Sequence, residues 1–248
     1  MKCSVLASGS KGNCTYIETD NHKILVDIGT TSLYIENKLK EININPKEID
    51  TVFITHDHVD HINGLKTFIK KYGCNVYMTG KLYQKLNSLI DDYIDINGEI
   101  VLDTLKVKTI KTSHDATDSV GYIFEENNSS IVYVTDTGYI HQKWHNTLMN
   151  KNLYIFESNH DVSLLMNGKY PHYLKQRVLG DKGHLSNKDS SRYLSKFIGK
   201  DTKYVILAHL SEENNTESLA LDEFNKINDN NITVYVAKQN ERTELINV

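Results

Sequence analysis

The chain has little of what marks membrane, disulfide-stabilised or secreted proteins. None of its apolar runs approaches the roughly 20 residues that a membrane-spanning helix needs. The N-terminus enters a strand-like pattern at Lys2 and shows no signal-peptide core. Its three cysteines, Cys3, Cys14 and Cys74, are odd in number and lack paired spacing, which favours reduced thiols in a core over a disulfide framework or metal ligands. These absences predict a cytoplasmic protein with no membrane association.

Linker-like sequence is equally scarce. Only two prolines occur, Pro46 and Pro171, and no Gly/Ser/Pro-rich stretch divides the 248 residues. We therefore expect residues 1–248 to form a single domain. The formal net charge of −4 argues weakly against a nucleic-acid partner. Two bound divalent cations would cancel that charge, most strongly at their own site.

Short β-branched and aromatic runs alternate with helical patterns along the chain. The strands we predict are Lys2–Ala7, Cys14–Thr19, Lys23–Ile28, Thr51–Thr55, Asn75–Met78, Leu105–Thr112, Val120–Glu125, Ser130–Thr135, Leu153–Glu157, Tyr204–Ala208 and Ile232–Val236. The predicted helices are Ser32–Glu41, Gly64–Tyr72, Lys81–Leu89, Gly138–Asn146, Asn187–Phe197 and Glu217–Asn228, and Ser186 to Asp189 fits a capping box. This pattern predicts an α/β fold of two sheets with helices on both outer sides.

The densest chemical signal is the stretch from Thr55 to His61, which contains three histidines and two aspartates directly after an apolar run. Such groups are costly to bury and are poor partners for one another. A divalent cation removes the difficulty, because imidazoles and carboxylates are its natural ligands. The sequence therefore predicts a metal site here. The alternative is a polar turn that is rich in histidine.

Three further residues of the ligand type follow predicted strands. They are His114, Asp136 and His209. Taken singly, His114 would be a surface residue and Asp136 a turn residue or helix cap. The shared arrangement of strand, ligand-type residue and loop favours a common site at one edge of the sheets.

Together, His56-x-His58-x-Asp60-His61 and these three residues resemble the metallo-β-lactamase superfamily over nearly the whole chain. The resemblance implies an αββα four-layer sandwich with two divalent metal ions, Zn²⁺ being expected and Mn²⁺ or Fe the alternatives. It implies that one metal is held by His56, His58 and His114, the second by Asp60, His61 and His209, with Asp136 bridging them. Asp27, at the end of an earlier strand, would orient the ligand loop. A hydroxide shared by the two metals would then attack phosphorus or carbonyl centres.

The branch of the superfamily follows from the second half of the chain. True lactamases carry a cysteine ligand and lack the adjacent Asp60-His61 pair. Three segments instead resemble the nuclease branch and, within it, the YycJ (WalJ) family of DNA exonucleases: Met166-x-Gly168-x-Tyr170-Pro171, Gly183-His184-Leu185-Ser186-Asn187 and His209-Leu210-Ser211-x-x-Asn214-Asn215. The resemblance implies a phosphodiesterase acting on nucleic acid, DNA more than RNA.

Several residues near these segments are candidates for catalysis or substrate binding. His184 begins a predicted helix, where it could bind phosphate or protonate the leaving oxygen, with Glu157 orienting it; alternatively it bonds to backbone. Asp60 could accept a proton during the attack. His160 is either a substrate contact or a loop residue. A basic stretch that includes Lys175 and Arg177, with interleaved tyrosines, is either a phosphate-binding surface or a solvated helix face; its other cationic or imidazole members are Lys169, His172 and Lys182.

The predicted function is therefore a two-metal DNA exonuclease. One alternative is a small-molecule hydrolase, either a thioesterase of the glyoxalase II kind or a cyclic phosphodiester hydrolase. The other is a metal-stabilised binding module without turnover.

Overall fold

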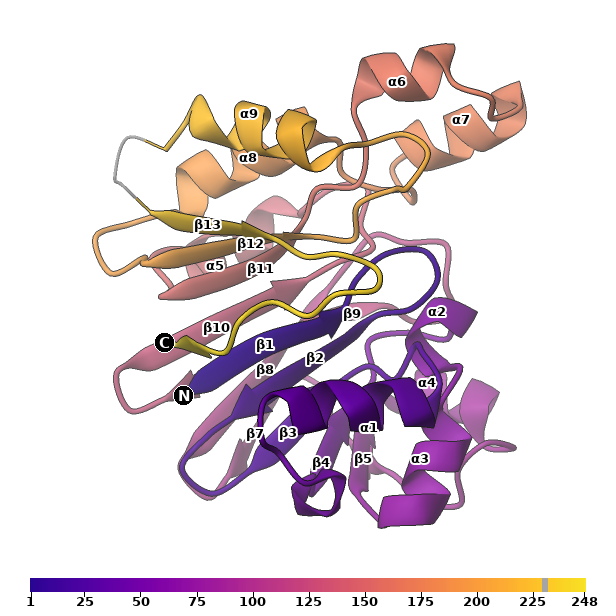
Figure 1. The fold of residues 1–248 in the computed structure, drawn as a ribbon, viewed down its shortest axis with the longest axis vertical. Coiled ribbons are helices and arrows are strands. Elements are labelled where there is room, and N and C mark those ends of the chain that lie inside the picture. Colours follow the sequence, from indigo (N-terminus) through magenta and orange to yellow (C-terminus); the bar gives the residue numbers. More distant parts are fainter. Residues whose placement is uncertain (229–231) are drawn as a thin grey trace.

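Two mixed β-sheets lie face to face, and helices cover their outer sides (Figure 1). The structure is a computed structural model and describes residues 1–228 and 232–248. Each sheet has seven strands, in the orders β14-β1-β2-β3-β4-β5-β6 and β13-β12-β11-β10-β9-β8-β7. The predicted αββα architecture is confirmed.

The strands of the first sheet are β1 (Lys2–Ala7), β2 (Cys14–Glu18), β3 (Lys23–Val26), β4 (Thr51–Phe53), β5 (Asn75–Met78), β6 (Ile94–Asp95) and β14 (Ile246–Asn247). Those of the second are β7 (Glu99–Leu102), β8 (Leu105–Lys111), β9 (Val120–Glu126), β10 (Ser129–Val134), β11 (Leu153–Glu157), β12 (Tyr204–Ala208) and β13 (Thr233–Val236). Strands β3 to β6 pair in parallel, and so do β10 to β13. Each sheet thus has a parallel half whose strands end at a common edge.

Helices close each sheet from outside. The first half of the chain contributes α1 (Ser32–Glu41), α2 (Val59–Ile62), α3 (Leu65–Tyr72), α4 (Gly80–Leu86) and the 3₁₀ turn η1 (Pro46–Glu48). The second half contributes α5 (His145–Leu148), α6 (Val162–Asn167), α7 (His172–Leu179), α8 (Asn187–Phe197), α9 (Glu217–Asn225) and the 3₁₀ turn η2 (Gln142–Trp144). Figure 1 shows α6 and α7 projecting beyond the layers formed by the other helices.

Three apolar clusters separate these layers. The central one lies between the sheets and includes Val26, Phe53, Tyr122 and Tyr133. Two outer clusters join α1, α3 and α4 to the first sheet and α5, α8 and α9 to the second. Because the central strands are covered on both faces, they read as nearly continuous apolar runs.

One predicted helix is wrong. Residues 138–141 are not helical, and the segment forms only η2 and the short α5. The amide of Gly138 donates to the carbonyl of Ser113 at 2.9 Å, and a Cβ on Gly138 would lie 2.3 Å from the carbonyl oxygen of Asp181. Tertiary contacts thus hold the chain out of a helix here. By contrast, the N-cap of the predicted capping box of α8 is confirmed, since Ser186 Oγ accepts from the Asp189 amide.

Candidate metal centre and active site

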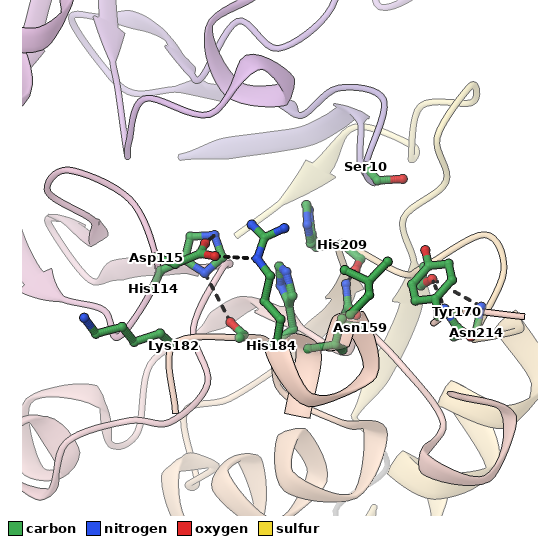
Figure 2. A pocket seen from close by; sticks show the side chains of 14 residues that line it. Ser10, His114, Asp115, Asn159, Tyr170, Lys182, His184, His209 and Asn214 are labelled. Carbon is green, nitrogen blue, oxygen red and sulfur yellow. Dashed lines mark hydrogen bonds and ion pairs between the residues drawn. The ribbon is translucent and has the colours of Figure 1, made fainter. Parts of the chain in front are cut away.

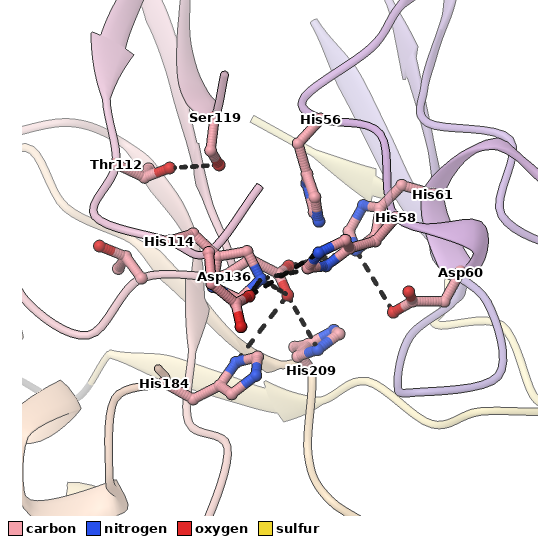
Figure 3. Close-up of polar contacts among 12 residues, drawn as sticks. His56, His58, Asp60, His61, Thr112, His114, Ser119, Asp136, His184 and His209 are labelled. Carbon is pink, nitrogen blue, oxygen red and sulfur yellow. Dashed lines mark hydrogen bonds and ion pairs between the residues drawn. The ribbon is translucent and has the colours of Figure 1, made fainter. Parts of the chain in front are cut away.

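The candidate ligands lie just after strands of both sheets, in loops or in the short helix α2, so residues far apart in the sequence meet at one edge (Figure 3). The β4–α2 loop carries His56 and His58, and Asp60 and His61 lie in α2. From the second sheet come His114 after β8, Asp136 after β10 and His209 after β12. The structure therefore brings all seven predicted ligands together.

Unusual backbone conformations place three of the carboxylate and imidazole groups. Asp27, Asp136 and His209 come at or within two residues of strand ends and have φ values of 61°, 56° and 57°. This left-handed region costs an L-residue about 1–2 kcal/mol. Strain of this kind persists only where the surroundings hold it, and it gathers at functional sites.

His56, His58 and His114 form the first cluster, and their ligand atoms lie within 4.8 Å of one another. Nδ1 of His58 is 3.2 Å from Nε2 of His114. Two nitrogens that share a tetrahedral zinc ion are about 3.4 Å apart, since each Zn–N bond is about 2.1 Å. Nε2 of His56 is buried and has no hydrogen-bond partner among the described residues. An orphaned nitrogen at this place fits a metal ligand.

Asp60, His61 and His209 form a second cluster. Asp136 lies between the clusters. Its Oδ1 is 3.2 Å from Nε2 of His209 and 3.6 Å from Nε2 of His114, and its Oδ2 is 3.2 Å from Nε2 of His61. Oδ2 is buried and, despite that proximity, has no aligned hydrogen bond among the described residues. The carboxylate is therefore placed to contact ions in both clusters.

The imidazole rings are oriented through Nδ1. His61 donates to Asp27 at 2.7 Å, His114 to the carbonyl of Gly183 at 3.2 Å, and His209 to Oδ1 of Asn13 at 3.1 Å. When Nδ1 donates in this way it carries the ring proton. The tautomer is then fixed, and Nε2 keeps an unshared electron pair. The Nε2 atoms of His61, His114 and His209 are thus the ring nitrogens left to bind a metal.

Asp27 connects the two ends of the ligand loop. Its carboxylate also accepts from the amide and the hydroxyl of Thr55, at 2.8 and 2.9 Å. Both Asp27 and His61 are fully buried. Asp27 therefore lies behind the cluster and holds both Thr55 and His61.

Asn13 is a residue that the sequence analysis missed. Its amide nitrogen lies 3.3 Å from Oδ2 of Asp60 and 3.1 Å from Nε2 of His61, while its oxygen accepts from His209 and from the Gly9 amide. One buried side chain therefore contacts every member of the second cluster. A single asparagine in a glycine-containing loop carries no signal of this in the sequence.

Glu157, which is buried, and His184, which is partly exposed, form a pair beside the clusters. Nδ1 of His184 donates to Oε1 of Glu157 at 2.7 Å, while Oε2 accepts from the amides of Thr137 and Leu185. Burial alone lowers the pKa of His184, but the charge and hydrogen bond of Glu157 outweigh it and raise that pKa to about 9. Because the Glu157 oxygens are already engaged, we regard it as the partner of His184 and not as a metal ligand, although its position near Asp136 would permit ligation.

A cavity of about 200 Å³ opens beside these groups (Figure 2). Among the side chains that line it are His114, His184, His209, Tyr170, Arg177 and Lys182. Two of the predicted substrate contacts are not part of its lining. His160 is buried with neither ring nitrogen hydrogen-bonded among the described residues, and Nζ of Lys175 donates to the carbonyl of Met166.

The family model of the metallo-β-lactamase superfamily matches residues 7–209. The chain belongs to the metallo-β-lactamase superfamily. The crystal structure of YhfI from Bacillus subtilis, a protein of the same fold, has a TM-score of 0.77 at 16% identity and covers 98% of this chain and 99% of its own. The short form of human tRNase Z has a TM-score of 0.68 at 14% identity, over the whole of both chains.

More similar sequences narrow the family. Exodeoxyribonuclease WalJ of Streptococcus pneumoniae serotype 2 is 40% identical over 228 residues, which is 88% of this chain and 85% of that protein. Exodeoxyribonuclease YycJ of Bacillus anthracis is 37% identical over 224 residues, with the same coverage. The predicted resemblance to the YycJ (WalJ) family is confirmed. In the described part of this superfamily member, no helix has the length and apolarity to cross a membrane.

Proposed function

We propose that this chain is a two-metal phosphodiesterase that removes nucleotides from the end of a DNA strand. The observation that carries the proposal is the pair of clusters joined by Asp136, with orphaned ligand atoms on His56 and Asp136. Similarity to two exodeoxyribonucleases along 88% of the chain supports DNA as the substrate.

In this proposal His56, His58 and His114 hold one divalent ion and Asp60, His61 and His209 hold the other. Asp136 contacts both, and Asp27 fixes the ring of His61. Zn²⁺ is the ion that we propose, because imidazole nitrogens dominate the ligand set, with Mn²⁺ or Fe as alternatives. When bound, two such ions lower the pKa of a shared water and neutralise charge on the phosphate.

The remaining roles belong to side chains around the cavity. Asp60 has 23% of its side chain exposed and is placed to accept a proton from the attacking water. His184 has its Nδ1 held by Glu157, so its other nitrogen is free to donate a proton to the leaving oxygen or to bind a phosphate oxygen. Arg177 lines the cavity, and its Nε donates to Asp115 at 2.5 Å, which leaves its terminal nitrogens for a substrate phosphate.

Two residues that the sequence predicted as substrate contacts receive no such role in the proposal. His160 and Lys175 do not line the cavity, so we give them no direct contact with the reacting phosphate.

The three cysteines are buried and free, which supports a reducing compartment such as the cytoplasm.

The test is an assay of metal-loaded protein on end-labelled single- and double-stranded DNA and RNA, beside bis-p-nitrophenyl phosphate as a generic phosphodiester. We expect progressive shortening of DNA and weaker action on RNA. The matched control is Asp136→Asn, which keeps the side-chain shape and tolerates the left-handed backbone. Cleavage of the generic ester alone would overturn the nuclease assignment and leave a small-molecule hydrolase. Equal activity in the Asp136→Asn protein would contradict the two-metal site.

A further inference from the structure

The segment from residue 162 to residue 180, which comprises α6, α7 and their connection, differs in composition from the rest of the chain. It contains no aspartate or glutamate, whereas the whole chain has 32 acidic residues and a net charge of −4. Its cationic side chains are Lys169, Lys175 and Arg177. The α6–α7 segment is therefore a basic surface on an acidic protein, and it favours an anionic partner.

Its exposed apolar side chains are unusual as well. Tyr173 is 73% exposed and Met166 is 50% exposed. Val162, Leu164 and Leu179 are also exposed, so the segment holds five of the eleven large apolar side chains that are exposed in the described part of the chain. Apolar groups gathered on one projecting element, rimmed by polar residues, mark an interaction surface (Figure 1).

The segment is also anchored to the body of the protein. The amide of Asp161, just before α6, donates to the carbonyl of Asn214, and the Asp161 side chain caps the helix at the Leu164 amide. Lys175 ties α7 to the end of α6, and Arg177 ties α7 to Asp115. The exposed side chains are thus presented from a braced element.

This surface is continuous with the active-site cavity. The inner side of α7 contributes Leu174, Arg177 and Val178 to the cavity lining, and Tyr170 lies there beside Asn214 (Figure 2). A second hollow, of about 530 Å³, lies on the outer part of the segment against Leu164, Gly168, Lys169 and Glu213. A chain that leaves the cavity over α7 would meet Tyr173 and Lys169.

We propose that the α6–α7 segment binds the single-stranded stretch of the DNA substrate next to the end being cleaved. This inference rests on the proposed function and adds the substrate form to it. Exposed bases stack on Tyr173 and pack on its apolar neighbours, while Lys169 and Arg177 pair with phosphates. A duplex hides its base faces within the stack and cannot use these apolar groups.

A second copy of the chain is a poorer occupant of the same surface. In a two-fold dimer built on this surface the same basic patch would lie on both subunits, so cationic side chains would face a second cationic patch. No acidic residue of the segment is available to compensate that repulsion.

The experiment compares Tyr173→Ala and Lys169→Gln with the unaltered protein. Binding of a fluorescent single-stranded 20-nucleotide DNA is measured in the presence of chelator, so that it does not depend on turnover. We expect Tyr173→Ala to weaken binding about 10-fold, since one base stack is lost. Lys169→Gln should reduce the salt slope of binding by about 0.7, as expected for one phosphate contact. Hydrolysis of bis-p-nitrophenyl phosphate should be unchanged in both variants, because neither Tyr173 nor Lys169 lines the active-site cavity.

Matched controls lie in α1, at the opposite end of the molecule from α6 and α7 (Figure 1). Leu33→Ala removes an apolar side chain that is 64% exposed, and Lys40→Gln removes an exposed charge; both should leave DNA binding unchanged. The proposal is overturned if Tyr173→Ala and Lys169→Gln bind DNA as the unaltered protein does. It is also overturned if Tyr173→Ala changes the oligomeric state without changing DNA affinity, or if blunt duplex DNA binds as tightly as the single strand. DNA that binds through Tyr173 but is never cleaved would refute the proposed function and leave this surface standing.

Discussion

Replacing Asn13 by alanine should separate the two metal sites. The side chain is 1% exposed, and its oxygen accepts from Nδ1 of His209 at 3.1 Å. Its nitrogen contacts Asp60 and His61, but nothing links it to His56, His58 or His114. The substitution therefore disturbs the second cluster and leaves the first one intact.

The size of the effect follows from what is lost. Removing a group that orients metal ligands lowers metal affinity by about 10- to 100-fold, or about 1.4–2.7 kcal/mol. The Gly9 amide also loses its acceptor, which costs about 1–3 kcal/mol of folding stability if water cannot replace it. Titrating metal-free protein with Zn²⁺ against a chromophoric chelator should give one site of unaltered affinity and one weakened site.

Loss of stability alone must be separated from loss of ligand orientation. Asn152 is a matched control, because it is 8% exposed and also makes two side-chain hydrogen bonds, to Ser130 and the carbonyl of Asp201. Asn152→Ala should lower the unfolding midpoint and still bind two ions normally. Two ions bound with unaltered affinity in the Asn13→Ala protein would refute the reasoning.

Three further outcomes test other parts of the site. Asp136→Asn should lower hydrolysis at least about 100-fold, while the far-ultraviolet circular dichroism stays the same; retained activity would remove Asp136 from the metal centre. Stripping the metals with chelator should abolish hydrolysis and lower the melting temperature. The melting temperature falls because an ion at 100 times its Kd adds about 2.7 kcal/mol per site to the free energy of unfolding. An unchanged melting temperature would argue against bound ions in the folded state. Burial lowers the pKa of His160 to about 4, below the ordinary value near 6.5 of the unfolded chain, so the unfolded state binds more protons between these values and stability falls as the pH drops through that window. Urea titration of chelator-treated protein measures how much unfolding free energy is lost between pH 7 and pH 4.5. In the His160→Gln protein this loss should be smaller by about 2–3 kcal/mol than in the unaltered protein. An equal loss in the two proteins would contradict the assignment of this pH dependence to His160.

The layers of the fold could be predicted because the central strands are buried on both faces. Segments such as Tyr204–Ala208 must then be apolar throughout, and this is visible in the sequence. The short edge strands β6 and β14 have two residues each, too few to show a pattern. Strand ends were misjudged where the backbone turns left-handed: β3 was predicted to reach Ile28 but ends before Asp27.

The candidate ligands could be predicted because histidine and aspartate are rarely crowded without a purpose. The residues that orient them were harder to recognise. Asp27 entered only through the resemblance, and Asn13 was missed. Their hydrogen bonds join positions 34 and 196 residues apart, to His61 and His209 respectively, and no local pattern records such contacts. The α6–α7 segment was also missed as helices, because its helices have only six and eight residues and carry no buried periodic face.

The left-handed residues explain why the site depends on the whole sandwich. Asp27 and Asp136 follow strands of different sheets, and each turns its carboxylate toward His61. Each left-handed conformation costs about 1–2 kcal/mol. This cost is offset only while the packed sheets hold the ends of both strands in place. A mutation in the central core, such as one at Phe53, which packs against Tyr122 across the sheets, would therefore weaken metal binding without touching a ligand. Metal affinity therefore depends on how well the two sheets pack against each other.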